Sequence, residues 1–97
     1  MLPIRYRDFY DVPRMFIVEH SGNLYLFDAP FDKKNDKYQD TNTINVVPDK
    51  LRTKLDDKSW AGLEKECRQV GNIKVRDVVF DQTVRKAVDA SCIDRLA

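Results

Sequence analysis

The single histidine, His20, is the residue of this sequence best suited to acid–base chemistry near neutral pH. It follows Glu19 and lies three positions before Asn23, so a carboxylate and an amide are close to it in sequence. A histidine can also activate a cysteine that is distant in sequence, and the candidates are Cys67 and Cys92. Neither cysteine has a local context that would activate its thiol. A histidine beside a turn is more often a solvated residue, and we predict no catalytic residues in this chain.

Oxygen ligands of the kind that calcium prefers occur in a polar segment where aspartates recur every four residues: Asp32, Asp36 and Asp40. This spacing differs from the alternating ligands of an EF-hand loop, and the lysines between the aspartates oppose cation binding. The two cysteines lie 25 residues apart without a CxxC motif, and one histidine excludes multi-histidine sites. The three glycines form neither of the common Gly-rich phosphate-binding motifs. We therefore predict neither a metal site nor a cofactor.

Basic and aromatic residues alternate near the start of the chain, in Arg5, Tyr6 and Arg7, and Arg14 follows. Such residues stack on bases and neutralise phosphates in proteins that bind single-stranded nucleic acid. Aspartates dilute the charge of this segment, and the formal charge of the whole chain is only +1. Charge of this kind is also typical of an edge strand, where it discourages aggregation. Nucleic-acid contact through these four residues is therefore an alternative hypothesis, and we expect nucleic acid not to be the main partner.

The strongest structural signal is a predicted β-hairpin from Arg14 to Asp28. Two apolar runs, 15–18 and 24–27, flank a turn at Ser21-Gly22 or Gly22-Asn23, and either choice leaves every side chain on the same face. One face is aliphatic, with Met15, Ile17, Leu24 and Leu26. The other face carries the aromatic residues, with Phe16, Val18, Tyr25 and Phe27 as its apolar members. His20 and Asn23 lie on the same face, near the turn. Because both faces are apolar, both must be covered.

The aromatic face allows two interpretations, which differ in what buries it. This face is either further core of a single chain or an exposed patch for binding, since large exposed apolar patches mark interaction sites. In the second case the predicted interface consists of Phe16, Val18, His20, Tyr25 and Phe27. On the aliphatic face, we expect the central residues Ile17 and Leu26 to lie in the main core.

The flanking segments predict further strands. Residues 3–11 form an edge strand, residues 31–43 a polar loop with at most a helical turn, and residues 43–47 a short strand. Leu51 and Leu55 are spaced as on one edge of a short helix.

The second half of the chain predicts one helix and one strand. Ser59 and Gly71 suit the two ends of a helix, and the apolar residues between them recur with helical spacing: Trp60, Leu63, Cys67 and Val70. Residues 72–81 predict a strand. Residues 82–97 form either one helix or a strand at 84–88 followed by a short helix capped by Asp89, and we favour the second arrangement.

The composition predicts one domain over residues 1–97, with 42% hydrophobic and 34% charged residues. The fold class is α+β and mainly β: a small curved antiparallel sheet or open barrel of about five strands with one or two short helices. No uncharged run is long enough to cross a bilayer, and the first residues carry charges where a signal peptide is apolar. We therefore expect a cytoplasmic protein that does not bind membranes.

Three functions fit these observations. The leading hypothesis is a small, non-catalytic protein–protein interaction module that forms a homodimer, because a short chain has little material to cover two apolar faces. The alternatives are a nucleic-acid-binding module and a small enzyme or ligand-binding barrel with a site near His20. A self-complementary aromatic contact would favour the first, a continuous basic stripe the second, and a concave pocket reaching His20 the third.

Overall fold

The computed structural model describes residues 2–10, 12–55, 60, 63–81, 83 and 87–94. The strands among them are β1 (Leu2–Tyr10), β2 (Val12–His20), β3 (Asn23–Asp28), β4 (Phe31–Asp32), β5 (Lys37–Tyr38), β6 (Thr41–Val46), β7 (Arg68–Lys74) and β8 (Ala87–Val88). The helical elements are the 3-10 turns η1 (Asp49–Lys54), η2 (Leu63–Glu66) and η3 (Val75–Asp77) and the one-turn α-helix α1 (Ser91–Asp94). None of the helices in these ranges is long and apolar enough to cross a bilayer.

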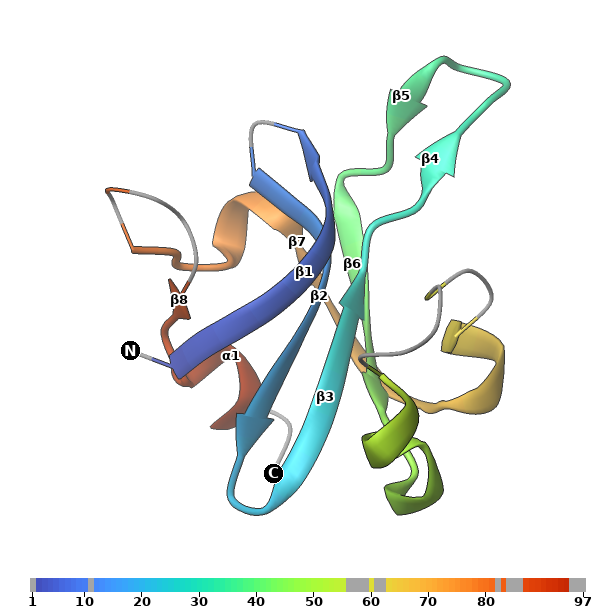
Figure 1. The fold of residues 1–97 in the computed structure, drawn as a ribbon. Coiled ribbons are helices and arrows are strands. Elements are labelled where there is room, and N and C mark those ends of the chain that lie inside the picture. Colours follow the sequence, from blue (N-terminus) through green and yellow to red (C-terminus); the bar gives the residue numbers. More distant parts are fainter. Residues whose placement is uncertain are drawn as a thin grey trace.

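Six strands form one antiparallel sheet in the order β7-β6-β3-β2-β1-β8 (Figure 1). The described strands do not close into a barrel, because β7 and β8 lie at opposite ends of this order. The mainly β, antiparallel architecture agrees with the prediction. The eight described strands exceed the predicted number, because the expected loop over 31–43 contains the hairpin β4–β5, which projects from the sheet.

The predicted hairpin is β2–β3, and its two-residue turn is Ser21-Gly22, since His20 pairs with Asn23. Both turn residues have positive φ angles, 52° at Ser21 and 82° at Gly22. A turn of this hand matches the twist of antiparallel strands, and glycine adopts it without strain. The pairs Phe16–Phe27 and Ile17–Leu26 confirm the predicted division of the hairpin into two faces.

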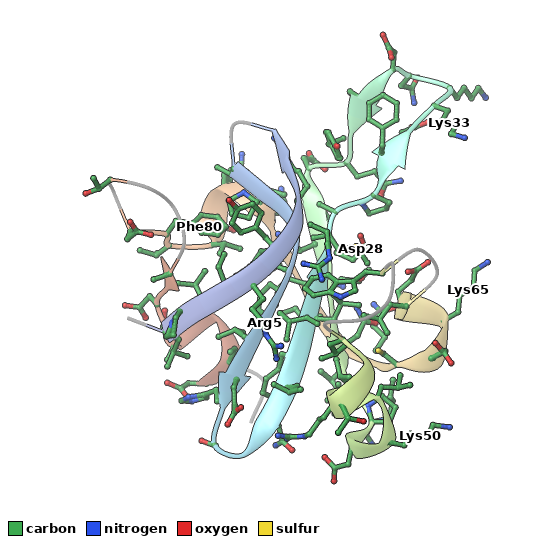
Figure 2. All side chains as sticks on the ribbon, viewed as in Figure 1. Arg5, Asp28, Lys33, Lys50, Lys65 and Phe80 are labelled. Atoms are coloured by element: carbon green, nitrogen blue, oxygen red, sulfur yellow. The ribbon has the colours of Figure 1, made fainter. Side chains whose placement is uncertain are left out.

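Side chains lie on both sides of the sheet (Figure 2), and both faces of the hairpin are buried within the single chain. The aliphatic face is covered by η1, Trp60 and η2 in a cluster of Met15, Ile17, Leu24, Leu26, Val47, Leu51, Leu55, Trp60 and Leu63. The aromatic face is covered by the segment that follows β7, in a cluster of Phe16, Val18, Phe27, Ile44, Val78, Val88 and Ile93. Ile17 and Leu26 are core residues, as predicted. The chain itself thus supplies the second cover.

The predicted helix over 59–71 is wrong. Leu63–Glu66 forms only the 3-10 turn η2, and the chain then enters β7, which pairs with β6. Trp60 and Leu63 pack on the aliphatic cluster as expected, but Val70 joins the aromatic cluster on the other side of the sheet. The exposed backbone edge of β6 outweighs local helix propensity here, because pairing satisfies its hydrogen bonds.

The predicted strand over 72–81 is also shifted. β7 begins at Arg68 and ends at Lys74, followed by η3. Farther on, β8 and α1 agree with the preferred arrangement of a strand followed by a helix, and Asp89 accepts a hydrogen bond from the Ser91 amide at 2.8 Å. Residues 84–86 and 95–97 of that prediction lie outside the described residues. The segment predicted as an edge strand is β1, but it is not the edge of the sheet, because β8 pairs with it at Leu2 and Pro3.

Candidate ligand-binding site

A pocket of about 350 Å³ lies at the turn end of the β2–β3 hairpin, on the aromatic side of the sheet. It is lined by His20, Ser21, Asn23, Tyr25, Val46, Arg68, Val70, Ile93 and Asp94. Its volume lies at the lower end of the range for small-molecule sites. Two residues of the predicted interface, His20 and Tyr25, and two residues at the hairpin turn thus border this concave site.

The pairing of neighbouring strands brings several of the lining residues into one row across the sheet. Val18 pairs with Tyr25, Tyr25 with Val46, and Val46 with Arg68, so the row crosses β2, β3, β6 and β7. Directly paired residues point to the same face, which is the face of the buried Val18. A shift of one residue in either β6 or β7 would turn its side chain to the opposite face. The pocket therefore depends on the register of the sheet.

The remaining wall comes from α1. Asp89 fixes the start of this turn by accepting from the Ser91 amide, and this hydrogen bond lowers the pKa of Asp89. Ile93 is 4% exposed in the aromatic cluster, and Asp94 is exposed beside it. Burial of Ile93 thus holds the Asp94 carboxylate at the rim of the pocket.

His20 and Asp94 form an ion pair or charge-assisted hydrogen bond, with 2.8 Å between Nε2 and Oδ1. A carboxylate oxygen accepts hydrogen bonds, so Nε2 is the donor in this contact. The side chains are 24% and 64% exposed, respectively. This contact joins residues 74 positions apart and ties α1 to the hairpin.

The pocket combines an apolar floor with polar groups at its rim. Val46, Val70 and Ile93 supply the floor. Arg68 is exposed at the rim, and Asn23 Nδ2 lies 3.5 Å from the Tyr25 hydroxyl, to which it donates. Such a combination of apolar surface with a few orienting polar groups is typical of ligand sites.

The cysteine–histidine pairing considered from the sequence is not formed by Cys67. This residue packs against the aliphatic cluster, on the opposite side of the sheet from the pocket. Burial raises the pKa of its thiol to about 11, and the neighbouring carboxylates of Glu66 and Glu64 contribute to the shift. Little thiolate therefore exists at neutral pH. The Cys92 side chain lies outside the described part of the structure. Glu19 pairs with Leu24 on the aliphatic face and is not a neighbour of the His20 ring.

The residues proposed for nucleic-acid contact are divided among different surroundings. The Arg7 guanidinium stacks over Trp60, 4.3 Å from the ring centroid, and donates to the Leu55 carbonyl. Arg14 lies 5.2 Å from the centroid of the Tyr38 ring. Tyr6 packs against the aromatic cluster, whereas Arg5 pairs with Ile17 on the aliphatic face. The structure does not bring these four residues together as one continuous stripe.

The predicted interface is divided as well. Phe16, Val18 and Phe27 are at most 1% exposed within the chain, so they belong to the core. His20 and Tyr25 are half-buried and line the pocket. The sequence could not distinguish these cases, because core and interface require the same apolar side chains.

Of the aspartates considered as calcium ligands, Asp32 holds the β4–β5 turn, whereas Asp40 lies beyond it, between β5 and β6. Asp32 accepts hydrogen bonds from the Asn35 side chain and from the Asn35 and Lys34 backbone amides, and these hydrogen bonds lower its pKa. Among the described residues, no group of three metal-binding side chains is present.

Sequence reasoning identified His20 but missed Arg68 and Asp94. Arg68 falls within the helix predicted between Ser59 and Gly71, and its place opposite Val46 follows only from pairing with β6. The signal for Asp94 was its position in the short helix capped by Asp89. Comparison with known protein families, with curated proteins and with solved structures gives no match to this chain, so the geometry of the pocket carries the functional argument.

Proposed function

We propose that this protein is a small-molecule-binding module whose site is the pocket beside His20. The observation that carries the proposal is the convergence of His20, Arg68 and Asp94 over an apolar floor. By contrast, the aromatic face expected to mediate dimerisation is mostly core. The described residues that line the pocket include no cysteine, and we propose ligand binding as the function of this site.

Nuclear magnetic resonance with a library of small neutral, anionic and cationic fragments tests this function. Bound fragments are expected to shift the backbone amide signals of Val46, Val70 and Ile93 together, because these residues form the floor. Val46→Phe should remove the response by filling the pocket. Val79→Phe is the matched control, because Val79 is 54% exposed and is not part of the lining. Absence of any pocket-specific shift, or equal binding by Val46→Phe, would contradict the proposal.

Self-association is a second candidate function, and the observation that favours it is the arm formed by β4 and β5. The arm projects from the sheet (Figure 1), and its Phe31 side chain is 45% exposed. Phe31 packs edge-on against Tyr38, with 5.2 Å between ring centroids. The hydrogen bonds of Asp32 hold the turn, so the aromatic surface is ordered before contact. We propose that a second copy of the chain covers this surface.

Sedimentation equilibrium measures the proposed dimer. Phe31→Ser is expected to weaken dimerisation by about tenfold or more, since aromatic residues dominate interface energetics. Val79→Ser removes exposed apolar surface elsewhere and should leave the dimer unchanged. A monomeric mass for the unmodified protein at high micromolar concentration would refute this second function.

A further inference from the structure

We infer that the His20 pocket selects organic anions with a short apolar tail, of which a small aliphatic carboxylate is the simplest representative. This inference rests on the proposed function, because it names the class of ligand for the same site. It follows from the distribution of donors, acceptors and apolar surface around the lining.

The charged groups of the lining favour a negative ligand. Of the three ionisable groups His20, Arg68 and Asp94, the first and last are bound to each other. The Asp94 oxygen that contacts His20 is therefore already engaged, whereas Arg68 forms no ion pair with any described residue. A guanidinium is the side chain whose geometry best matches a carboxylate or phosphate.

Neutral groups at the rim add further donors. Ser21, Asn23 and Tyr25 also line the pocket, and their side chains carry hydroxyl or amide groups, which are hydrogen-bond donors. A cationic ligand would instead meet the Arg68 guanidinium, and one of the two Asp94 carboxylate oxygens is already bound to His20. The balance of the rim therefore disfavours cations.

The floor requires an apolar part in the ligand. Val46, Val70 and Ile93 are aliphatic, and their surface gains nothing from an ion without a hydrocarbon tail. Arg68 stands directly opposite Val46 in the β6–β7 pairing, so the cationic group and the apolar floor are neighbours. A ligand with its charge at one end and a short chain at the other satisfies both.

Four probes that differ in charge or in the length of the apolar tail test the class: hexanoate, hexylamine, hexan-1-ol and acetate. Each is titrated into the 15N-labelled protein, and affinity is read from the amide shifts of the floor residues. We expect hexanoate to bind at least tenfold more tightly than hexylamine, because hexylamine has the opposite charge. We expect the same margin over acetate, because acetate lacks the apolar tail. Hexan-1-ol should be intermediate.

Arg68→Gln is the decisive variant, and Lys74→Gln is its control at the other end of β7, outside the lining. We expect Arg68→Gln to weaken hexanoate binding by about tenfold, as for loss of a charge-assisted hydrogen bond, and to leave hexan-1-ol binding unchanged. Equal binding of hexanoate and hexylamine in the pocket, or an unchanged hexanoate affinity in Arg68→Gln, would overturn the ligand class while leaving the proposed function intact. Failure of all four probes and of the fragment library would overturn both.

Discussion

Truncation of either Leu26 or Phe27 to alanine is expected to lower the free energy of unfolding by about 2 to 5 kcal/mol. The two residues are adjacent in β3, both are 0% exposed, and they point to opposite sides of the sheet. Phe27 also stacks on Phe16, with 4.7 Å between ring centroids. Large losses at both positions would therefore demonstrate that a single chain has two separate cores.

Equilibrium unfolding in urea measures these losses. Val79→Ala is the control, because this side chain is 54% exposed and its truncation should change the free energy of unfolding by less than about 0.5 kcal/mol. A loss below about 1 kcal/mol for Phe27→Ala, with a normal loss for Leu26→Ala, would show that the aromatic side is solvated in solution. Such a result would favour the interpretation of the aromatic face as an interface.

The hairpin could be predicted because its determinants are local. The turn requires two residues with positive φ, and Gly22 meets that requirement within the sequence Ser21-Gly22. The alternation of Phe16, Ile17 and Val18 then assigns each residue to a face without knowledge of the rest of the fold. The turn residues and the alternation of side chains along each strand were thus sufficient to predict the hairpin at the centre of the sheet.

The segment from Trp60 to Val70 could not be predicted in the same way. Its spacing fits a helical stripe, yet Trp60 and Val70 end on opposite sides of the sheet. The sequence does not reveal that the chain passes the edge of β6 at this point and adds a strand there. An irregularity opposite Ile44 and Asn45 in the β6–β7 pairing further disrupts simple alternation.

The pocket combines residues of the predicted hairpin with residues of segments whose positions could not be predicted. His20 and Tyr25 were assigned to one face from the hairpin alone, but Arg68 joins them through the register of a strand that was not predicted. Asp94 reaches His20 from a distance of 74 residues in sequence. A sequence pattern indicates which side chains share an element, whereas a site of this kind depends on which elements become neighbours.

Replacement of Asn42 by leucine is expected to raise the free energy of unfolding by about 1 to 3 kcal/mol. Asn42 lies in β6 and is 1% exposed, and neither its Oδ1 nor its Nδ2 atom has a hydrogen-bond partner among the residues that the structure describes. The side chain points to the same side of the sheet as Ile44, two positions along the strand. Leucine has a similar shape and needs no partner, so the cost of desolvating the amide would disappear.

Asn45 provides the matched control, because it is the same residue type, in the same strand and 3% exposed. Its Nδ2 donates to the Leu26 carbonyl at 3.2 Å and to the Thr43 hydroxyl at 3.0 Å. Asn45→Leu should therefore lower the free energy of unfolding by about 1 to 3 kcal/mol, since it leaves these acceptors without the amide donor. Urea unfolding of the two variants should thus show effects of opposite sign. A destabilised Asn42→Leu protein would indicate that the Asn42 amide is hydrogen-bonded in solution, with a buried water as its partner, because only a satisfied amide loses by this replacement.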